Sequence, residues 1–565
     1  MQELYTLRGE TLKGDPWQVY PRPQMKRDSY INLNGSWDFA VGDTQPETFD
    51  KTILVPFCPE CLLSGIQTHY PEGSGLWYRR SFVLPADFRK DKVLLHVGAA
   101  DQVAEVWVNG ISVGKHEGGY EAFCLDITQA LQEHNELVVC CRDDLNDQSF
   151  PYGKQVLPEK RGGMWYTPVS GIWQTVWLES VPKNHVEKLF ITPKGDTAVI
   201  ATFPALNGTI HVEGLGDYPL HNGTASIKVD TPRYWSPEDP YLYSFTLEAG
   251  EDKVESYFAL RTLEVKKVGD FQRLCLNGKP YFFHGLLDQG YWSDGLLTPP
   301  APESYADDIL AMKKLGFNTL RKHIKVEAEE FYYQCDKLGM IVWQDMVNNS
   351  DYNFIRDTAL PTARIQKLDD RKWHMQPGHR EAFKKYAEAA VKQLCNHPSI
   401  CYWTIFNEGW GQFDSDNVYE WFRKLDSTRF IDTTSGWFRR KKSDVDSFHV
   451  YFRKVKLKAG KKKPLVLSEF GGYSYKPEGH VYNTENTYGY GKYQDLDAFT
   501  TAVEELYNEQ ILPAVRQGLC ASIYTQVSDV QDETNGLLTY DRKVEKLNPA
   551  AMRLIASSLQ EAVRE

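Results

Sequence analysis

The chain has 565 residues, of which 42% are hydrophobic and 25% charged, and it carries 64 basic against 76 acidic side chains. This composition excludes wholesale disorder, and the net charge of −12 argues against a protein that follows nucleic-acid phosphates. At about 100–200 residues per domain, the length predicts three or four domains. Aromatic residues make up 13% of the chain, which suits the cores of β-sandwiches and also surfaces that stack on sugar rings.

The N-terminal residues and the cysteines bear on the compartment. The N-terminus has no apolar segment typical of signal peptides, and no run of about 18 apolar residues occurs. The ten cysteines are scattered, and the C-x-x-C pair of Cys58 and Cys61 has no second pair at zinc-finger spacing. We therefore expect free thiols, no metal site, no membrane partner and a cytoplasmic protein.

Residues 1–180 alternate short strand-like runs with turns and show little helical periodicity. The clearest runs lie at 36–41, 77–84, 92–98, 104–110, 137–143 and 173–180. The pair Asn109-Gly110 after one run is a strong hairpin signal. About six short strands at this spacing predict a β-sandwich of the jelly-roll type. Residues 181–263 continue in the same style and predict a small immunoglobulin-like β-sandwich of roughly six or seven strands.

Residues 264–565 alternate strands with amphipathic helices, which predicts a parallel sheet. The expected strands lie at 281–286, 317–322, 341–345, 400–408, 430–435, 447–451, 465–470 and 521–526. The expected helices lie at 303–315, 327–338, 379–396, 415–426, 497–517 and 548–563. This order fits a (β/α)8 TIM barrel with a minimal connection between strands five and six. A doubly wound sheet is the structural alternative, but no G-x-G-x-x-G motif opens any of these helices.

Two glutamates stand at the ends of expected barrel strands. Glu408 ends the fourth strand in FNEGW, and Glu469 ends the seventh in SEFGG. Reactive residues of such a barrel gather at the C-terminal strand ends, and strands four and seven lie on opposite sides of the mouth. A buried carboxylate is costly unless it is paired or used. Two carboxylates that face each other across a cleft are the requirement for cleaving a glycosidic bond.

Motifs along nearly the whole chain resemble glycoside hydrolase family 2, the family of β-galactosidases, β-glucuronidases and β-mannosidases. Before the barrel they include GLWYRRSFVLP, VWVNGISVGKHEGGYEAF, SGIWQTVWLE and FALRTLEV. In the barrel they continue through LNGKPYFFHGLLDQGYW, LGFNTLRKH, CDKLGMIVWQDM, NHPSICYWTIFNEGW and LSEFGG. The order and the spacing of the motifs both agree with the family.

The resemblance implies a retaining mechanism with Glu408 as the general acid/base and Glu469 as the nucleophile. It also implies that Asn407 hydrogen-bonds the 2-hydroxyl of the sugar, and that Arg321 pairs with the nucleophile and lowers its pKa. We expect Tyr451, at the end of strand six, to hydrogen-bond the nucleophile, with a packing role as the alternative. For retention, the two carboxyl groups should lie about 5–5.5 Å apart.

Other residues at the strand ends can contact the sugar. Asp288, Gln289 and Asp345 are candidates to bind hydroxyl groups, and strand-end capping is the alternative for each. Three tryptophans beyond strand ends can stack on a pyranose ring, with core packing as the alternative. These are Trp292, Trp410 and Trp437.

The segment after Arg321 departs from the family. β-Galactosidases and β-glucuronidases usually continue Arg-x-x-His-Tyr-Pro, whereas here the histidine, His323, comes one residue earlier. A shift of one residue places a side chain on the opposite face of a regular strand. His323 is therefore a candidate for binding substrate only if the strand is irregular there.

Basic residues gather at the expected strand tops, and they concern the kind of sugar. A solvated basic rim is one interpretation, and an acidic or phosphorylated sugar is the other, because guanidinium groups hold such anions bidentately. β-Glucuronidases hold the substrate carboxylate with an Asn-x-Lys pair after strand eight, and the comparable stretch 533–537 lacks that lysine. The basic residues are Lys322, Lys325, Arg439, Arg440 and Arg453.

These observations predict a retaining exo-β-glycosidase that removes terminal β-linked sugars, most like a β-galactosidase. A uronide (β-glucuronidase) or β-mannoside hydrolase with the same machinery is the alternative within this class. A non-catalytic carbohydrate-binding protein is the alternative from another class, and the intact Asn407, Glu408 and Glu469 weigh against it. We expect no cofactor and no nucleic-acid partner, and the resemblance implies a homo-oligomer.

Overall fold

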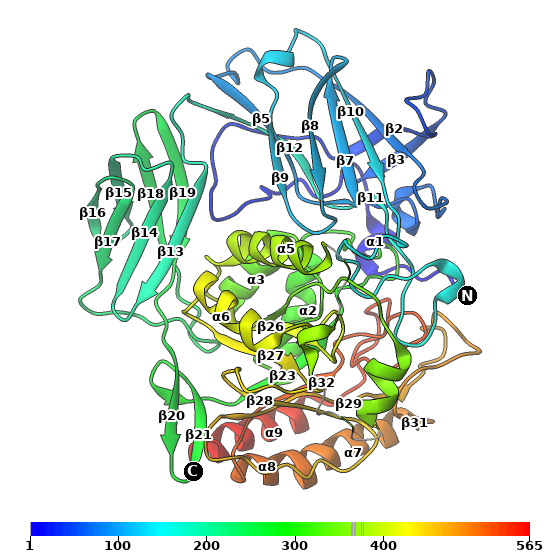
Figure 1. Cartoon of the computed structure of the whole chain (residues 1–565), viewed down its shortest axis with the longest axis vertical. Coiled ribbons are helices and arrows are strands. Elements are labelled where there is room, and N and C mark those ends of the chain that lie inside the picture. The colour runs from blue at the N-terminus through cyan, green and yellow to red at the C-terminus, as the bar shows by residue number, and fades with distance from the viewer. Residues whose placement is uncertain (1, 363–364, 366–368, 374–375, 377) are drawn as a thin grey trace.

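The structure, a computed structural model, describes residues 2–565 apart from 363–364, 366–368, 374–375 and 377. It consists of two β-sandwiches and a nearly closed parallel barrel, as the sequence predicts (Figure 1). In Figure 1 the first sandwich lies at the top in blue and cyan, the second at the left in green, and the barrel below them. No helix in these described ranges is long and apolar enough to cross a membrane.

The first sandwich packs a six-stranded sheet, with the order β3-β2-β4-β10-β7-β8, against a four-stranded sheet, with the order β1-β12-β5-β9. Its strands are β1 (Tyr30–Asn32), β2 (Gly35–Val41), β3 (Lys51–Val55), β4 (Leu76–Phe82), β5 (Lys92–Val97), β6 (Ala100–Asp101), β7 (Val103–Val108), β8 (Ile111–Glu117), β9 (Phe123–Asp126), β10 (Asn135–Arg142), β11 (Gly171–Ile172) and β12 (Val176–Val181). Alternate residues of β7 are buried, because one face of its sheet meets the other sheet. Apolar residues of both sheets form one core, which is the expected jelly-roll arrangement.

The second sandwich pairs a three-stranded sheet, β13-β14-β17, with a four-stranded sheet, β16-β15-β18-β19. Its strands are β13 (Lys188–Lys194), β14 (Thr197–Phe203), β15 (Gly208–Val212), β16 (Gly216–Leu220), β17 (Thr224–Lys228), β18 (Tyr243–Ala249) and β19 (Asp252–Phe258). Both sheets contribute side chains to one apolar core. The strand number and the antiparallel pairing agree with the expected immunoglobulin-like sandwich.

A hairpin introduces the barrel, whose eight parallel strands follow the order β27-β26-β25-β24-β23-β32-β29-β28. The hairpin consists of β20 (Leu263–Val268), β21 (Phe271–Leu276) and β22 (Lys279–Pro280). The barrel strands are β23 (Phe283–Asp288), β24 (Thr319–Lys322), β25 (Ile341–Asp345), β26 (Ile400–Asn407), β27 (Phe430–Ser435), β28 (Asp446–Val450), β29 (Leu465–Gly471) and β32 (Leu519–Thr525). All eight expected strands are present, and the connection from β27 to β28 contains no helix, as expected.

Helices cover the barrel where the periodicity places them. They are α2 (Glu303–Lys314), α3 (Glu329–Leu338), α5 (His379–Leu394), α6 (Ser415–Leu425), α7 (Leu496–Leu506), α8 (Leu512–Arg516) and α9 (Pro549–Ala562), with the short α1 (Leu7–Thr11) and α4 (Leu360–Thr362) elsewhere. The long helix expected at 497–517 is interrupted by a π-helical turn between α7 and α8. A small sheet of β30 (Tyr473–Tyr475) and β31 (Gly491–Tyr493) follows β29.

The segment between β10 and β11 leaves the first sandwich and lies against the mouth of the barrel. We call residues 143–170 the docking loop. The backbone N–H of Tyr152 donates to the carbonyl of Asn348 at 3.1 Å, and the Tyr166 hydroxyl donates to Glu533 Oε2 at 2.6 Å. The first sandwich therefore supplies residues to the same end of the barrel that carries the two glutamates, which the sequence pattern does not reveal.

Candidate active site

Glu408 and Glu469 lie side by side at the carboxyl end of the barrel. Glu408 follows β26 directly, with a left-handed backbone (φ 51°), and Glu469 belongs to β29. The two residues are 8% and 4% exposed. A carboxylate oxygen of each and a ring nitrogen of His449 all lie within 4.8 Å of one another. The two strand ends thus bring their carboxylates together, as the barrel topology requires.

The surroundings of Glu469 favour its ionised form. Arg321 Nη1 donates to Glu469 Oε1 at 3.1 Å, and the Tyr451 hydroxyl donates to Oε2 at 2.5 Å. Burial acts to raise the pKa of Glu469, but His449 and Arg321 outweigh it and hold the pKa below the ordinary value. The surroundings of Glu469 therefore hold it as a carboxylate.

The surroundings of Glu408 raise its pKa and so favour its protonated form. Burial raises its pKa, and the negative charge of Glu469 adds to this effect. His449 opposes the rise, with Nδ1 2.7 Å from Glu408 Oε1 and 3.4 Å from Glu469 Oε2. Two carboxyl groups this close that differ in the direction of their pKa shifts have the arrangement of an acid and a nucleophile.

Arg321 connects the strands beneath the pair. Its guanidinium is fully buried and pairs with Asp345 at 3.0 Å as well as with Glu469. Nη2 also donates to Asn407 Oδ1 at 2.9 Å, which leaves the Asn407 amide N–H groups to face a ligand. Asp345 in turn lies 2.9 Å from His323 Nδ1. Asp345 is thus occupied by two side chains of the site, and its geometry suits a positioning residue.

A pocket with about 360 Å³ of empty space opens on the two glutamates. Among the expected residues, Asn407, Gln289, His323, Trp410 and Tyr451 line it together with the pair. The remaining lining residues were not singled out from the sequence: Lys154, Met164, Leu287, Tyr488, Tyr490, Thr525, Glu533 and Asn535. Lys154 and Met164 belong to the docking loop, so two domains of the chain build the pocket.

Asp288 and Trp292 lie outside the residues that line this pocket. Asp288 Oδ2 accepts a hydrogen bond from Lys322 Nζ at 2.6 Å. Asp288 thus has a strand-end hydrogen-bonding role, which was the alternative to binding a sugar hydroxyl. Trp292 is 3% exposed and packs under the guanidinium of Arg542, which lies 4.1 Å from its ring centroid. Trp437 is half-buried, with its ring centroid 6.4 Å from that of His449, at the edge of the site.

His323 lines the pocket and lies two residues after Arg321 of β24, and the side chains of both contact Asp345. Alternate residues of a strand share a face, and the backbone N–H of His323 still donates to the carbonyl of Asp288 on β23 at 2.9 Å. The argument that a shift of one residue moves the histidine to the opposite face therefore does not hold. Burial lowers the pKa of His323 to about 4, so the ring is neutral near pH 7.

The five basic residues at the strand tops comprise two buried lysines and three arginines, of which Arg439 and Arg453 are exposed and Arg440 is half-buried. Lys322 and Lys325 are at most 2% exposed, and their Nζ atoms lie 2.9 and 2.8 Å from Glu327 Oε1. Arg439 stacks over the Phe448 ring at 3.8 Å. None of the five basic residues is among the described residues that line the pocket. The two lysines therefore form buried ion pairs with Glu327, and they belong neither to a solvated rim nor to a site for an acidic sugar.

His449 contacts both glutamates but was not predicted from the sequence. It lies on β28 two positions before Tyr451, and successive alternate residues of a strand share a face. The same periodicity that places Tyr451 toward the mouth therefore places His449 there. One nitrogen of its ring and one oxygen of each carboxylate lie within 4.8 Å of one another, which is close enough to hold a cation.

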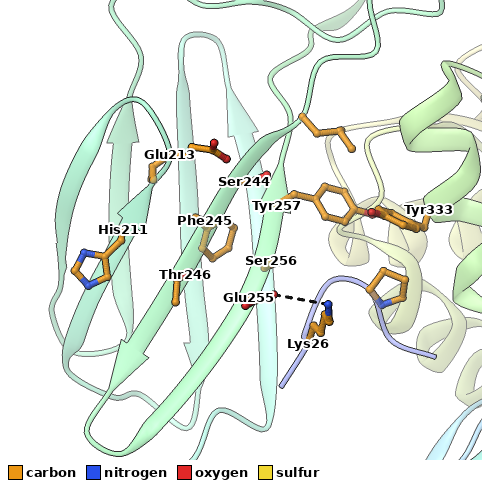
Figure 2. Close-up of a pocket in the computed structure, with 13 residues that line it drawn as sticks. Lys26, His211, Glu213, Ser244, Phe245, Thr246, Glu255, Ser256, Tyr257 and Tyr333 are labelled. Atoms are coloured by element: carbon orange, nitrogen blue, oxygen red, sulfur yellow. Dashed lines mark ion pairs between the residues drawn. The ribbon is translucent and has the colours of Figure 1, made fainter. Parts of the chain in front are cut away.

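A separate cavity with about 980 Å³ of empty space lies between the second sandwich and the barrel. Figure 2 shows its lining, with His211, Glu213 and Phe245 on the sandwich and Tyr333 on the barrel side. An ion pair of 3.9 Å joins Lys26 and Glu255 at its edge. None of the residues around the two glutamates belongs to this cavity.

Comparisons with known proteins cover all three parts of the chain. The model of the TIM barrel domain of glycosyl hydrolases family 2 matches residues 266–555. The model of the galactose-binding domain-like part of glycosyl hydrolase 2 matches residues 66–153. A further model described as glycosyl hydrolases family 2 matches residues 184–261.

Individual relatives carry more than one activity in their names. A β-galactosidase of Thermoanaerobacter pseudethanolicus is 26% identical over 71% of this chain and 54% of its own length. A human β-glucuronidase is 25% identical over 61% of this chain and 56% of its own, so the chain spans about half of these relatives. The solved β-D-glucuronidase of Dictyoglomus thermophilum has a TM-score of 0.71 and 18% identity, over 96% of this chain and 98% of that one. With the barrel model matching more than half of its residues, the chain belongs to glycosyl hydrolase family 2.

Proposed function

We propose that this protein is a retaining exo-β-glycosidase that hydrolyses terminal β-linked sugars by double displacement. The observation that carries the proposal is the pair of buried carboxyl groups, Glu408 and Glu469, with oxygens within 4.8 Å and pKa values shifted in opposite directions. Retaining glycosidases hold their carboxyl groups about 5–5.5 Å apart, whereas inverting ones leave about 6.5–9.5 Å for a water molecule. A non-catalytic sugar-binding protein has no need of such a pair.

In the first step the Glu469 carboxylate attacks the anomeric carbon while Glu408 gives its proton to the glycosidic oxygen, and the bond to the leaving group breaks. Arg321 and Tyr451 hold Glu469 in the ionised form and in place. In the second step Glu408, now a carboxylate, removes a proton from water, which attacks the same carbon and frees Glu469. His449 contacts both carboxyl groups, so its ring lies beside whichever of the two carries the negative charge in each step.

The type of sugar is the finer part of the proposal. The sequence motifs favour a β-galactoside, and one named relative is a β-galactosidase. Other named relatives are β-glucuronidases, so a uronide substrate has at least equal support. Rates on a panel of nitrophenyl β-D-glycosides, including galactoside, glucuronide, galacturonide and mannoside, would identify the sugar.

The stereochemistry of the product tests the mechanism directly. We expect the first product of the preferred β-glycoside to be the β-anomer, because two inversions at the anomeric carbon restore its configuration. Proton NMR during the first turnovers, before mutarotation, measures this. The α-anomer as first product would contradict the double displacement while leaving the hydrolase assignment intact.

The pH profile should report on His449. Activity is lost at low pH as Glu469 becomes protonated and at high pH as Glu408 loses its proton. The acid limb therefore lies below, and the alkaline limb above, the ordinary glutamate pKa of 4.5. Since His449 lowers the pKa of both groups, we expect His449→Gln to move both limbs of kcat/KM to higher pH.

The exposed His134 provides the matched control for this experiment. His134→Gln should leave both limbs where the unmodified protein has them. A His449→Gln profile that only falls in height, with both limbs unmoved, would contradict a role of the ring in setting the two pKa values.

A further inference from the structure

Lys154 brings a positive charge into the active-site pocket from another domain. It belongs to the docking loop of the first sandwich, and its own backbone carbonyl accepts a hydrogen bond from Tyr166 N at 3.1 Å. The preceding Gly153 passes so close to the barrel that a Cβ there would lie 3.0 Å from the carbonyl oxygen of Ile324. The backbone on both sides of Lys154 is therefore held in place, and the side chain is positioned before any ligand arrives.

The ammonium group of Lys154 is buried without an anionic partner. The residue is 6% exposed, and Nζ lies 5.5 Å from the ring centroid of Trp410 and 5.6 Å from that of Tyr166. In the part of the chain that the structure describes, Nζ has no hydrogen bond to a side chain or carbonyl and no ion pair within 4.0 Å. A buried ammonium is costly unless an anion or several acceptors surround it.

The carboxylates of the pocket already have other partners. Glu469 is held by Arg321 and Tyr451, and Glu408 by His449. Glu533 Oε2 accepts hydrogen bonds from the Tyr166 hydroxyl at 2.6 Å and from Gln526 Nε2 at 2.9 Å.

Neutralising Glu533 is the competing role for Lys154. Burial raises the pKa of Glu533, and the charge of Lys154 offsets only part of this effect. A lysine placed to neutralise a carboxylate would form an ion pair with it, as Lys546 does with Asp529 at 2.7 Å in the same barrel. Lys154 forms no such pair with Glu533, so its charge remains available to a ligand.

Two further hydrogen-bond donors of the pocket are free in the described structure. Asn535 Nδ2 and Trp410 Nε1 are buried and have no partner among the described residues. Asn535 is held through its other amide atom, because Oδ1 accepts from Gln526 Nε2 at 2.9 Å. An ammonium, an amide N–H and an indole N–H that all lack acceptors match a ligand that is rich in acceptors and negatively charged.

We propose that Lys154 binds the carboxylate of a uronic acid at the non-reducing end of the substrate, with Asn535 as a second donor, and so makes the protein a β-uronide hydrolase. This inference rests on the proposed glycosidase function. The substituent at C5 of a pyranose lies across the ring oxygen from the anomeric carbon, so a cation in the same pocket as the catalytic pair is suitably placed to contact it. The docking loop would then supply the cation that the stretch 533–537 lacks.

The test compares sugars that differ only in this carboxylate. We expect the unmodified protein to hydrolyse nitrophenyl β-D-glucuronide or galacturonide with kcat/KM at least about 100-fold above that for the matching glucoside or galactoside, since a charge-assisted contact contributes about that factor. Lys154→Met should lower kcat/KM on the uronide by about 100-fold and change that on the neutral sugar by less than about threefold. Lys154→Arg, which keeps the charge, should keep the preference for the uronide.

Lys160→Met is the matched control, because this lysine lies exposed in the same docking loop, and it should leave both rates unchanged. Thermal unfolding of each variant shows whether the fold is intact. A protein that prefers the neutral sugar would overturn the inference, and so would a Lys154→Met variant that loses the same factor on both sugars, since that result indicates a structural role beside Glu533. Failure of the glycosidase proposal looks different: no β-glycoside of either kind is then hydrolysed by the unmodified protein.

Discussion

Glu469→Gln is expected to lower kcat/KM by about 10⁴-fold or more while the protein stays folded, since removal of one member of a catalytic unit costs rates of this order. The amide has nearly the shape of the carboxylate: its oxygen can still accept from Arg321, which holds Oε1 at 3.1 Å, and its NH2 group can donate to the hydroxyl oxygen of Tyr451, which lies 2.5 Å from Oε2. It cannot attack the anomeric carbon. Initial rates on the preferred nitrophenyl glycoside, with circular dichroism of the variant, measure the two parts of this expectation.

Glu478→Gln is a suitable control, because this glutamate is exposed in the loop after β30, and it should keep full activity. A 2-fluoro derivative of the preferred glycoside provides a second test, since slow hydrolysis of its ester lets the covalent intermediate accumulate. Mass spectrometry of peptides should then find the label on Glu469. A label on Glu408 would reverse the two roles, and near-normal rates of Glu469→Gln would refute the double displacement through this residue.

Glu408→Ala is expected to slow hydrolysis of glycosides with poor leaving groups by about 10²–10⁴-fold, the usual contribution of a general acid. Substrates with a nitrophenyl leaving group need no proton, so the first step should suffer far less with them. The covalent intermediate then accumulates, because the base that activates water is missing. Comparing an alkyl with a dinitrophenyl glycoside of the same sugar measures this difference.

Azide distinguishes the acid/base from the nucleophile. It needs no general base, so it should restore turnover of Glu408→Ala on activated substrates and give the β-glycosyl azide through the intermediate on Glu469. Azide that replaces Glu469 in a Glu469→Ala variant should instead give the α-glycosyl azide. An α-product from Glu408→Ala would contradict the assignment of the two residues.

The order of secondary structure and the two central residues follow from the sequence alone. The period of two in the first 263 residues and the alternation of strands and helices afterwards are local patterns, and the eight strands of the barrel lie where those patterns place them. The carboxyl ends of parallel strands must meet at one end of a barrel. Glu408 and Glu469 could therefore be brought together without coordinates, and Arg321 and Asn407 with them.

Individual side chains at these strand ends were harder to assign. Asp288 and Trp292 stand at the end of β23 and just beyond it, yet one pairs with Lys322 and the other packs under Arg542. A strand end specifies which rim of the barrel a residue occupies, but its rotamer and its partners depend on neighbours that are distant in sequence. His323 shows the same limit, because its ring lies 2.9 Å from Asp345 of the neighbouring strand, a contact that the local sequence does not reveal.

The sequence by itself thus determined the three-part fold and the meeting of Glu408 and Glu469 at one end of the barrel, because both depend on short-range periodicity and on the rule that parallel strand ends converge. The family resemblance came from the motifs along the chain. Only the tertiary structure decided what completes the pocket. Lys154 lies more than 250 residues before Glu408 in the chain, and nothing in its local sequence distinguishes it from a solvated lysine. It reaches the pocket because the docking loop packs against the barrel, and long-range packing of this kind leaves no local pattern to detect. The net charge of −12 describes the whole chain, so it likewise gave no sign of the buried Lys154 ammonium in the pocket.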